Sequence, residues 1–378
     1  MTSEKDLQEI RSRDFLKNVD HYQDAADVQT DLIFGTPSEK PVFLTIIVPV
    51  YDHPVEFIRR AISSALNQPC SYDFQLLVID DYASREGPSD TELYLREKND
   101  PRVVYYKNKK NLGVFDNWNR AVTLSNSQWV TFLHSDDFLQ DHFLENMGRI
   151  VREHPEIDQL CCNYALLDFL HHQIDPQKEY HGIGGTKTVT KQRVMDYLYF
   201  FPTTVKGAFY KREKLLEIGG FRGQGRALGL DDYPLMLRFA YHYNTYLIDD
   251  VLYKDSWGYN DSLNLKHWYP QLIADYYMWL YFAKREPFFL RPLFRANARY
   301  LLAQRAKEFS DGTSWVGVPV PIDFEQLKTD CNLSSLKATP VVAPIVRRIV
   351  NLIMRCRQAN PQRFQVEILP TEESCILD

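Results

Sequence analysis

The chain has 378 residues, of which 44% are hydrophobic and 25% charged, a balance typical of a folded globular protein rather than a disordered one. Its 44 basic and 50 acidic side chains give a net charge of −6, which argues against a nucleic-acid-binding protein. The length is enough for one large α/β domain with accessory structure, or for two modest domains.

Cysteine spacing and hydropathy bear on the location of the protein. The six cysteines show no spacing that would hold zinc, and the charged N-terminal segment does not resemble a secretion signal. No apolar stretch reaches the roughly 18 residues needed to span a bilayer. We therefore expect a cytoplasmic protein, and we leave open a peripheral contact with the inner face of the cell membrane.

The first 40 residues are polar and charged with weak helical periodicity, and we expect them to form a peripheral helical arm. From residue 41 onward, β-branched apolar runs alternate with amphipathic segments. Strands are predicted at residues 42–50, 74–79, 103–106 and 129–133, and helices at residues 57–66, 91–98, 113–124 and 141–153. This alternation is typical of a parallel sheet with crossover helices.

Beyond about residue 150 the alternation loosens, and helical patterns dominate from residue 268. We therefore divide the chain into three regions. They are the arm at residues 1–40, a main domain at 41–265 with a nucleotide-binding half (41–150) and an acceptor half (151–265), and a helical C-terminal region at 266–378.

Residues 341–357 contain no acidic residue and predict an amphipathic helix. Its apolar face consists of Val342, Ile345, Val346, Ile349, Leu352 and Ile353, and its opposite face of Arg347, Arg348, Asn351 and Arg355. Such a helix either packs on the protein body or on a second subunit of a homo-oligomer, or lies at the surface of an anionic membrane. The sequence leaves these interpretations open.

Two pairs of acidic residues come at the ends of predicted strands. Asp80 and Asp81 follow the strand at 74–79, and Asp136 and Asp137 follow the strand at 129–133. In a parallel sheet, ligands bind outside the carboxyl ends of the strands. The first pair suits either a hydrogen bond from a nucleobase or ribose, or a solvated helix cap. The second suits a divalent cation that bridges to a diphosphate, because Mg²⁺ and Mn²⁺ prefer carboxylate oxygens.

A third acidic pair, Asp231 and Asp232, follows a glycine-bearing loop and precedes a helical pattern at residues 233–241. A carboxylate at this position is either a helix N-cap or a general base that takes the proton of an attacking hydroxyl.

Six motifs follow one another along the chain. They are IIVPVY at residues 46–51, LVIDD at 77–81, NLG at 111–113 with Asn119 and Ala121 after it, FLHSDD at 132–137, GGF at 219–221 and DD at 231–232. In this order and approximate spacing they resemble the family 2 glycosyltransferases, over roughly residues 42–265. The resemblance implies the GT-A fold, a Rossmann-like α/β fold with a mostly parallel sheet flanked by helices. It also implies sugar transfer from a nucleotide-sugar donor with inversion at the anomeric carbon.

The resemblance also implies roles for the nucleotide-binding residues. Pro49, Tyr51 and Asp81 match the nucleobase pocket, with Tyr51 stacking on the base and Asp81 accepting a hydrogen bond from its ring. Asn111 and Asn119 match positions that lie along the nucleoside.

The remaining implied roles concern metal and catalysis. Asp136 would contact the ribose and, with Asp137, hold a Mn²⁺ or Mg²⁺ ion, while Asp232 would be the catalytic base. Two positions depart from the family pattern. His134 stands where an aspartate usually leads the metal motif, and residues 254–262 lack the Arg and His found in many relatives. Lys254 or His267 could take their place as diphosphate clamp or third metal ligand.

The sequence therefore predicts an inverting glycosyltransferase of the hexosyltransferase type (EC 2.4). Its donor would be a UDP- or dTDP-sugar, and its acceptor a hydroxyl of a glycan or lipid-linked molecule in bacterial cell-surface polysaccharide synthesis. One alternative is a nucleotidyltransferase, although residues 49–54 lack the glycine-rich phosphate loop usual there. The other is a catalytically degenerate GT-A-like scaffold or partner protein, which the departures at the metal motif favour.

Overall fold

A computed structural model describes residues 3–81, 87–168, 173–174, 185–200, 205–222, 232–257, 265–314, 317–335, 342–358 and 360–369. These residues form one sheet of 12 strands in the order β1-β4-β3-β2-β5-β10-β7-β11-β9-β12, with β6 paired to β11 and β8 to β7. The strands are β1 (Thr30–Phe34), β2 (Val42–Val50), β3 (Phe74–Asp80), β4 (Val103–Asn108), β5 (Ser127–Phe132), β6 (Phe138–Leu139), β7 (Gln159–Asp168), β8 (Gln173–Ile174), β9 (Gly185–Gln192), β10 (Ala208–Lys211), β11 (Thr245–Trp257) and β12 (Arg363–Ile368).

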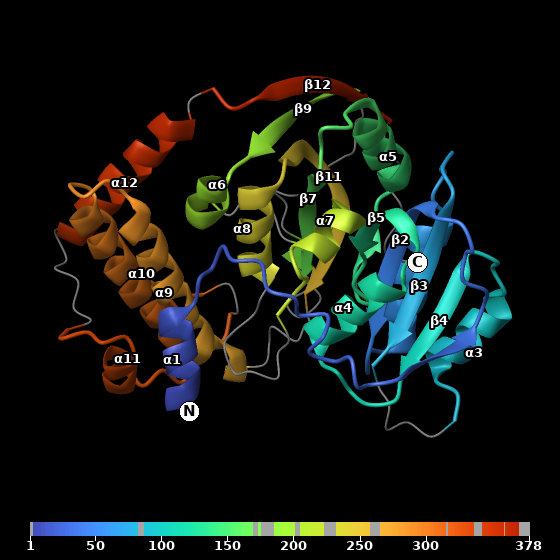
Figure 1. Cartoon of the computed structure of the whole chain (residues 1–378), viewed down its shortest axis with the longest axis horizontal. Helices are drawn as coiled ribbons and strands as arrows, with labels where there is room; N and C mark the ends of the chain where they lie inside the picture. Colours follow the sequence, from blue (N-terminus) through green and yellow to red (C-terminus); the bar gives the residue numbers. More distant parts are fainter. Residues whose placement is uncertain are drawn as a thin grey trace.

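Helices surround this sheet (Figure 1). They are α1 (Glu4–Ser12), α2 (Val55–Leu66), α3 (Asp90–Lys98), α4 (Val114–Leu124), α5 (Phe143–Glu153), α6 (Val194–Phe200), α7 (Arg212–Glu217), α8 (Asp232–His242), α9 (Trp268–Arg285), α10 (Arg291–Asp311), α11 (Phe324–Asp330) and α12 (Val342–Gln358). No helix within the described ranges is long and apolar enough to cross a bilayer.

The four strands predicted from apolar runs form the parallel half of the sheet. β2 pairs in parallel with β3 and β5, and β3 pairs in parallel with β4. Successive side chains of β2 enter different cores: Ile46 and Val48 lie in one hydrophobic cluster and Ile47 in the other. Because both faces are covered, these strands need apolar residues at nearly every position, which is why their sequence shows runs rather than alternation. The predicted α/β class with a helical C-terminal region is confirmed.

The other half of the sheet is mainly antiparallel, and the two edge strands of the whole sheet, β1 and β12, come from near the two ends of the chain. β7 and β11 pair in parallel, while β10, β9 and β12 pair antiparallel to their neighbours. The arm predicted to be helical contains α1 and then β1, which pairs antiparallel to β4. The C-terminal region predicted to be helical ends in β12, which pairs with β9. The predicted boundaries at residues 40 and 265 remain predictions.

The N-terminal arm packs into the same core as the C-terminal helices. Leu7, Ile10, Phe15 and Leu16 are buried in the cluster that also contains residues of α9 and α10. α12 packs on α10 and α6, with Val350 and Met354 fully buried against Ala283 and Phe294. In Figure 1, α9, α10 and α12 lie together on the side of the molecule opposite the parallel half of the sheet.

Candidate active site

The carboxyl ends of the parallel strands bring the first two acidic pairs to one edge of the sheet. The last residues of β2 and β3 are in register, Val50 beside Asp80, and the backbone N–H of Asp81 donates to the carbonyl of Val50 at 2.9 Å. β5 lies on the other side of β2, and the backbone N–H of Leu133 donates to the carbonyl of Ile47 at 2.9 Å. The loops that carry the candidate residues therefore start from neighbouring strands.

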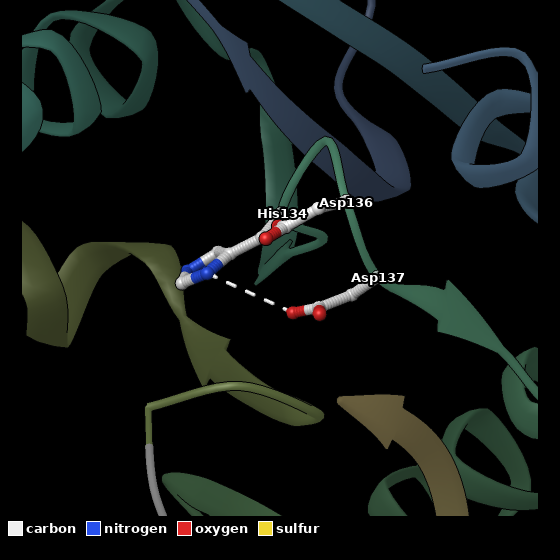
Figure 2. A group of neighbouring side chains, drawn as sticks. All are labelled: His134, Asp136 and Asp137. Carbon is white, nitrogen blue, oxygen red and sulfur yellow. Dashed lines mark ion pairs between the residues drawn. The ribbon is translucent and has the colours of Figure 1, made fainter. Parts of the chain in front are cut away.

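The loop at residues 134–137 is anchored by side chains from the segment that follows β2. His53 Nδ1 lies 2.6 Å from Ser135 Oγ, and Arg60 on α2 donates to the backbone carbonyl of Asp136 at 2.8 Å. Figure 2 shows His134, Asp136 and Asp137 projecting from this loop to the same side. Their potential ligand atoms all lie within 4.8 Å of one another.

Asp137 links the loop at residues 134–137 to residues from distant parts of the chain. Its side chain is fully buried, and it accepts hydrogen bonds from the backbone N–H of Ser256 (2.7 Å) and the hydroxyl of Tyr253 (2.8 Å). Lys206 Nζ forms ion pairs with Asp137 Oδ2 at 3.0 Å and with Asp255 Oδ1 at 2.7 Å. Burial alone would lower the pKa of Lys206, but Asp137 and Asp255 outweigh it and raise the pKa, so the amine stays charged.

Two polar side-chain atoms near Asp137 are buried without a hydrogen-bond partner among the described residues. Within the described part of the chain, neither His134 Nε2 nor Asp136 Oδ2 has a hydrogen-bond partner. Burial, Lys206 and His53 together lower the pKa of His134 well below its ordinary value, so its imidazole is neutral and keeps a lone pair. Unpaired buried polar atoms are costly, and a cation held by His134, Asp136 and Asp137 would satisfy them. An imidazole among the ligands suits Mn²⁺ better than Mg²⁺.

Asp81 occupies a different environment at the end of β3. It is buried and accepts three hydrogen bonds of 2.8 Å, from Asn108 Nδ2 and from the backbone N–H groups of Leu112 and Gly113. Burial, only partly opposed by these donors, raises the pKa of Asp81 to about 6. Its neighbour Asp80 accepts instead from the hydroxyl of Tyr105 at 2.6 Å. Asp81 therefore holds the loop at residues 111–113 through its bonds to Leu112 and Gly113.

The other residues of the predicted base pocket lie nearby in the chain. Pro49 is half-buried in β2 opposite Ile79, and Tyr51 follows the strand with 49% of its surface exposed. Asn111 is exposed, and its side-chain oxygen accepts from the backbone N–H of Gly113 at 3.0 Å. The backbone hydrogen bond from Asp81 to Val50 joins the end of β3 to the end of β2, where Pro49 and Tyr51 lie. Nucleotide binding by these residues remains a prediction.

Asn119 connects α4 to the segment that precedes the candidate base. Its side chain is buried, donates to the carbonyl of Phe221 at 2.5 Å and accepts from the N–H of the same residue at 2.8 Å. Gly220 has a φ of +72°, and a Cβ added there would lie 2.4 Å from Asn119 Oδ1. The amide of Asn119 is thus occupied by the protein backbone, and its predicted contact with a nucleoside is not tested by these bonds.

Asp232 is the first residue of α8 and is half-buried. Its Oδ1 accepts from the backbone N–H of Tyr233 at 2.8 Å, a contact that stabilises the anion at the helix N-terminus. Asp231 and the glycine-bearing loop at residues 223–231 lie outside the described residues.

Comparison with known proteins identifies the domain that carries this site. Residues 45–216 match the family described as Glycosyl transferase family 2. Over this segment, which is somewhat less than half of the chain, the protein is similar to the family 2 glycosyltransferases.

Curated relatives match only part of the chain. The poly(ribitol-phosphate) beta-N-acetylglucosaminyltransferase TarP of Staphylococcus aureus is 32% identical over 112 residues, 29% of this chain and 33% of TarP. The uncharacterized glycosyltransferase MJ1057 of Methanocaldococcus jannaschii is 24% identical over 122 residues, 32% of this chain and 41% of that protein. The chain therefore aligns with less than half the length of these relatives.

Solved structures also show similarity. A crystal structure of S. aureus TarS 1–349 covers 72% of this chain and 76% of its own, with a TM-score of 0.49 and 17% identity. The mannosyltransferase PcManGT from Pyrobaculum calidifontis, in complex with GDP-Man and Mn²⁺, covers 89% and 88%, with a TM-score of 0.45 and 14% identity.

The structure adds residues to the candidate site that the motifs did not indicate. In the sequence, His134 departs from the family pattern of the metal motif. In the structure, one of its ring nitrogens lies within 4.8 Å of a carboxylate oxygen of each of the two aspartates. The buried cation beside Asp137 is Lys206, while Lys254, one of the candidates from the sequence, lies in β11 opposite Phe138. His267, the other candidate, is the residue before α9. Lys206 and Asp255 are far from residue 137 in the sequence, so no local pattern could indicate them.

Proposed function

We propose that the protein is an inverting, metal-dependent glycosyltransferase (EC 2.4, hexosyltransferase type) that uses a nucleoside-diphosphate sugar. The observation that carries this proposal is the pair of open ligand atoms, His134 Nε2 and Asp136 Oδ2, at the carboxyl edge of the parallel strands. This is the edge at which parallel α/β sheets bind nucleotides. The family 2 match over residues 45–216 supports the same assignment.

The donor would be held by two groups of residues. Tyr51 would stack on the base, and Asp81 would accept from a ring N–H at the pairing edge. Uracil, thymine and guanine carry such a donor, whereas adenine and cytosine do not, and among these donors we propose a UDP- or dTDP-sugar. Pro49, Asn111 and Asn119 would border the nucleoside, and Asp136 the ribose. His134, Asp136 and Asp137 would hold Mn²⁺ or Mg²⁺, and such an ion neutralises charge on a diphosphate leaving group.

The transfer step would use the protein's own base. Asp232 takes the proton of the acceptor hydroxyl as its oxygen bonds to the anomeric carbon, and the bond from that carbon to the diphosphate breaks. Attack from the face opposite the leaving group inverts the configuration. Lys206 would hold the side chain of Asp137 in place, because it forms ion pairs with Asp137 and Asp255 alike.

The acceptor class follows from the relatives and is part of the proposal. TarP is named for poly(ribitol-phosphate), and another partial match, GgaB of Bacillus subtilis, is named a minor teichoic acid biosynthesis protein. We propose a hydroxyl of a glycan or lipid-linked cell-surface polymer, glycosylated in the cytoplasm. A degenerate scaffold remains the second candidate, and the closed network around Asp137, which already has three donors, is the observation that favours it.

The nucleotide preference tests this function directly. We expect UDP or dTDP, at 100 times its dissociation constant and with Mn²⁺, to stabilise the protein by about 2.7 kcal/mol in thermal unfolding. EDTA should abolish the shift, and ADP or GDP at the same concentration should give much less. If no nucleoside diphosphate shifts unfolding, the scaffold interpretation is favoured. Release of pyrophosphate from UTP, without hydrolysis of UDP-sugars, would instead indicate a nucleotidyltransferase.

The raised pKa of Asp81 predicts a pH-dependent base pocket. The Asp81 side chain can accept hydrogen bonds from a ring N–H and from the backbone N–H groups at the same time only when it is ionised. Because its pKa is about 6, the carboxylate becomes protonated below that pH. Uridine affinity should therefore fall about tenfold between pH 7.5 and pH 5. Uridine is the suitable probe in an NMR titration because it carries no phosphate that titrates in this range. Asp81→Asn should bind weakly without the pH step, and a flat profile for the unaltered protein would contradict the assignment.

A further inference from the structure

The C-terminal helices carry an exposed surface that is both apolar and basic, which we name the C-terminal face. Its apolar residues are between 42% and 79% exposed, and they are Phe288 and Phe289 in the α9–α10 loop and Ile345, Ile349 and Leu352 on α12. The spacing of the α12 residues places them on one stripe of the helix, opposite the buried Val350 and Met354. Half of the apolar face predicted for this helix therefore does not pack on the protein.

The two parts of the C-terminal face are fixed beside each other. Arg357 of α12 binds Glu286 at the start of the α9–α10 loop through two hydrogen bonds of 2.8 Å. At the other end of the loop, Leu290 packs against the cluster formed by Val350 and Met354. The phenylalanine pair thus belongs to a loop that α12 holds at both ends. The helices that this loop joins, α9 and α10, lie beside α12 on one side of the molecule in Figure 1.

The charges on the C-terminal face are of one sign. Exposed basic residues flank the apolar ones, namely Lys284, Arg291, Arg348 and Arg355, and none of these four forms an ion pair in the described part of the chain. Across residues 284–299 and 342–358, the single acidic residue is Glu286, which is buried and bound to Arg357. A chain of net charge −6 thus concentrates unpaired positive charge around its exposed phenylalanines.

We propose that the C-terminal face docks on a lipid bilayer that carries anionic headgroups. Phenylalanine, leucine and isoleucine side chains that protrude, rather than line a groove, suit the headgroup–acyl boundary, and the arginines suit the headgroup phosphates. Large exposed apolar side chains rimmed by charge mark interaction surfaces. This proposal concerns where the protein sits, and it does not depend on the transfer chemistry proposed above.

Vesicle co-sedimentation of the full chain tests the proposal. We expect binding to phosphatidylcholine vesicles containing 30% phosphatidylglycerol, little binding to pure phosphatidylcholine, and a loss of binding as NaCl rises from 0.1 to 0.5 M. Phe288→Ser with Phe289→Ser should weaken binding tenfold or more, and Arg348→Gln with Arg355→Gln should weaken it by about fivefold per arginine.

A matched control is available on the opposite side of the molecule. Leu93 and Lys98 on α3 are also exposed, and Leu93→Ser with Lys98→Gln should leave vesicle binding unchanged. Melting curves and UDP affinity in solution should be the same for all variants, so a lipid-binding defect cannot be confused with a failed nucleotide site. No binding of the unaltered protein to anionic vesicles would overturn the proposal. So would a dimer in gel filtration that the phenylalanine substitutions dissociate without affecting vesicle binding, since a second copy would then cover this face.

Discussion

Replacing Asp232 by asparagine should lower kcat by about 10²–10⁴-fold while leaving UDP affinity unchanged. Asparagine keeps the shape of the side chain and an oxygen that can accept from the backbone N–H of Tyr233, the contact that Asp232 makes at 2.8 Å. It loses the basicity that we propose removes the acceptor proton. Because the donor is proposed to be held at the ends of β2, β3 and β5, its binding should not change.

Steady-state kinetics and thermal unfolding on Asp232→Asn separate this role from helix capping. Loss of a cap alone would lower stability by about 1 kcal/mol and largely preserve turnover. Asp231→Asn is the matched control, since it removes the same charge one residue away. Near-normal turnover by Asp232→Asn together with an inactive Asp231→Asn would move the base to residue 231. If both variants transferred sugar normally, neither carboxylate would be the base.

Asp136 and Asp137 should respond in opposite ways to substitution. Asp136→Asn should leave stability almost unchanged, because Asp136 Oδ2 has no protein partner among the described residues. It should weaken Mn²⁺-dependent UDP binding on the order of 10²-fold, because it removes a proposed metal ligand. Asp137→Asn should destabilise the fold by about 3 kcal/mol, because Lys206 is buried and would lose one of its two counter-charges.

Calorimetric UDP titrations with and without Mn²⁺, combined with urea unfolding, measure both effects. Asn146→Asp, which alters a buried amide on α5 that bonds the backbone at Leu369, should cost stability without changing metal dependence. It therefore controls for destabilisation as a cause of weak binding. Unchanged metal-dependent affinity in Asp136→Asn would remove that residue from the ion site. An Asp137→Asn variant as stable as the unaltered protein would show that Lys206 is not held by this pair.

The chain's apolar pattern was sufficient to predict the parallel half of the sheet. Residues 42–50, 74–79, 103–106 and 129–133 coincide with β2, β3, β4 and β5 to within a few residues. Strands buried on both faces require continuous apolar runs, and that requirement is visible in the sequence without any partner. The acidic pairs after these runs placed the candidate site at the carboxyl edge of the parallel strands, since parallel strands align their carboxyl ends.

The two edge strands of the sheet were less predictable. β1 and β12 are short and partly polar, and their pairing with β4 and β9 depends on segments more than 70 residues away along the chain. A two-residue periodicity in such segments is weak next to the helical patterns around them. Which face of α12 is buried was also decided by contacts between segments far apart in the chain. Packing on α10 and α6 buries Val350 and Met354 and leaves Ile345 and Leu352 exposed.

What the sequence determined by itself was the identity of the acidic residues and the local strands that present them. Their chemical states were decided only by tertiary structure. The order β5-β10-β7-β11 brings Lys206, just before β10, and Asp255, in β11, to Asp137, and the burial that results keeps His134 neutral. Charge and pKa depend on which groups lie within a few ångströms after water is excluded, and that proximity arises from long-range pairing of strands rather than from neighbours in the chain.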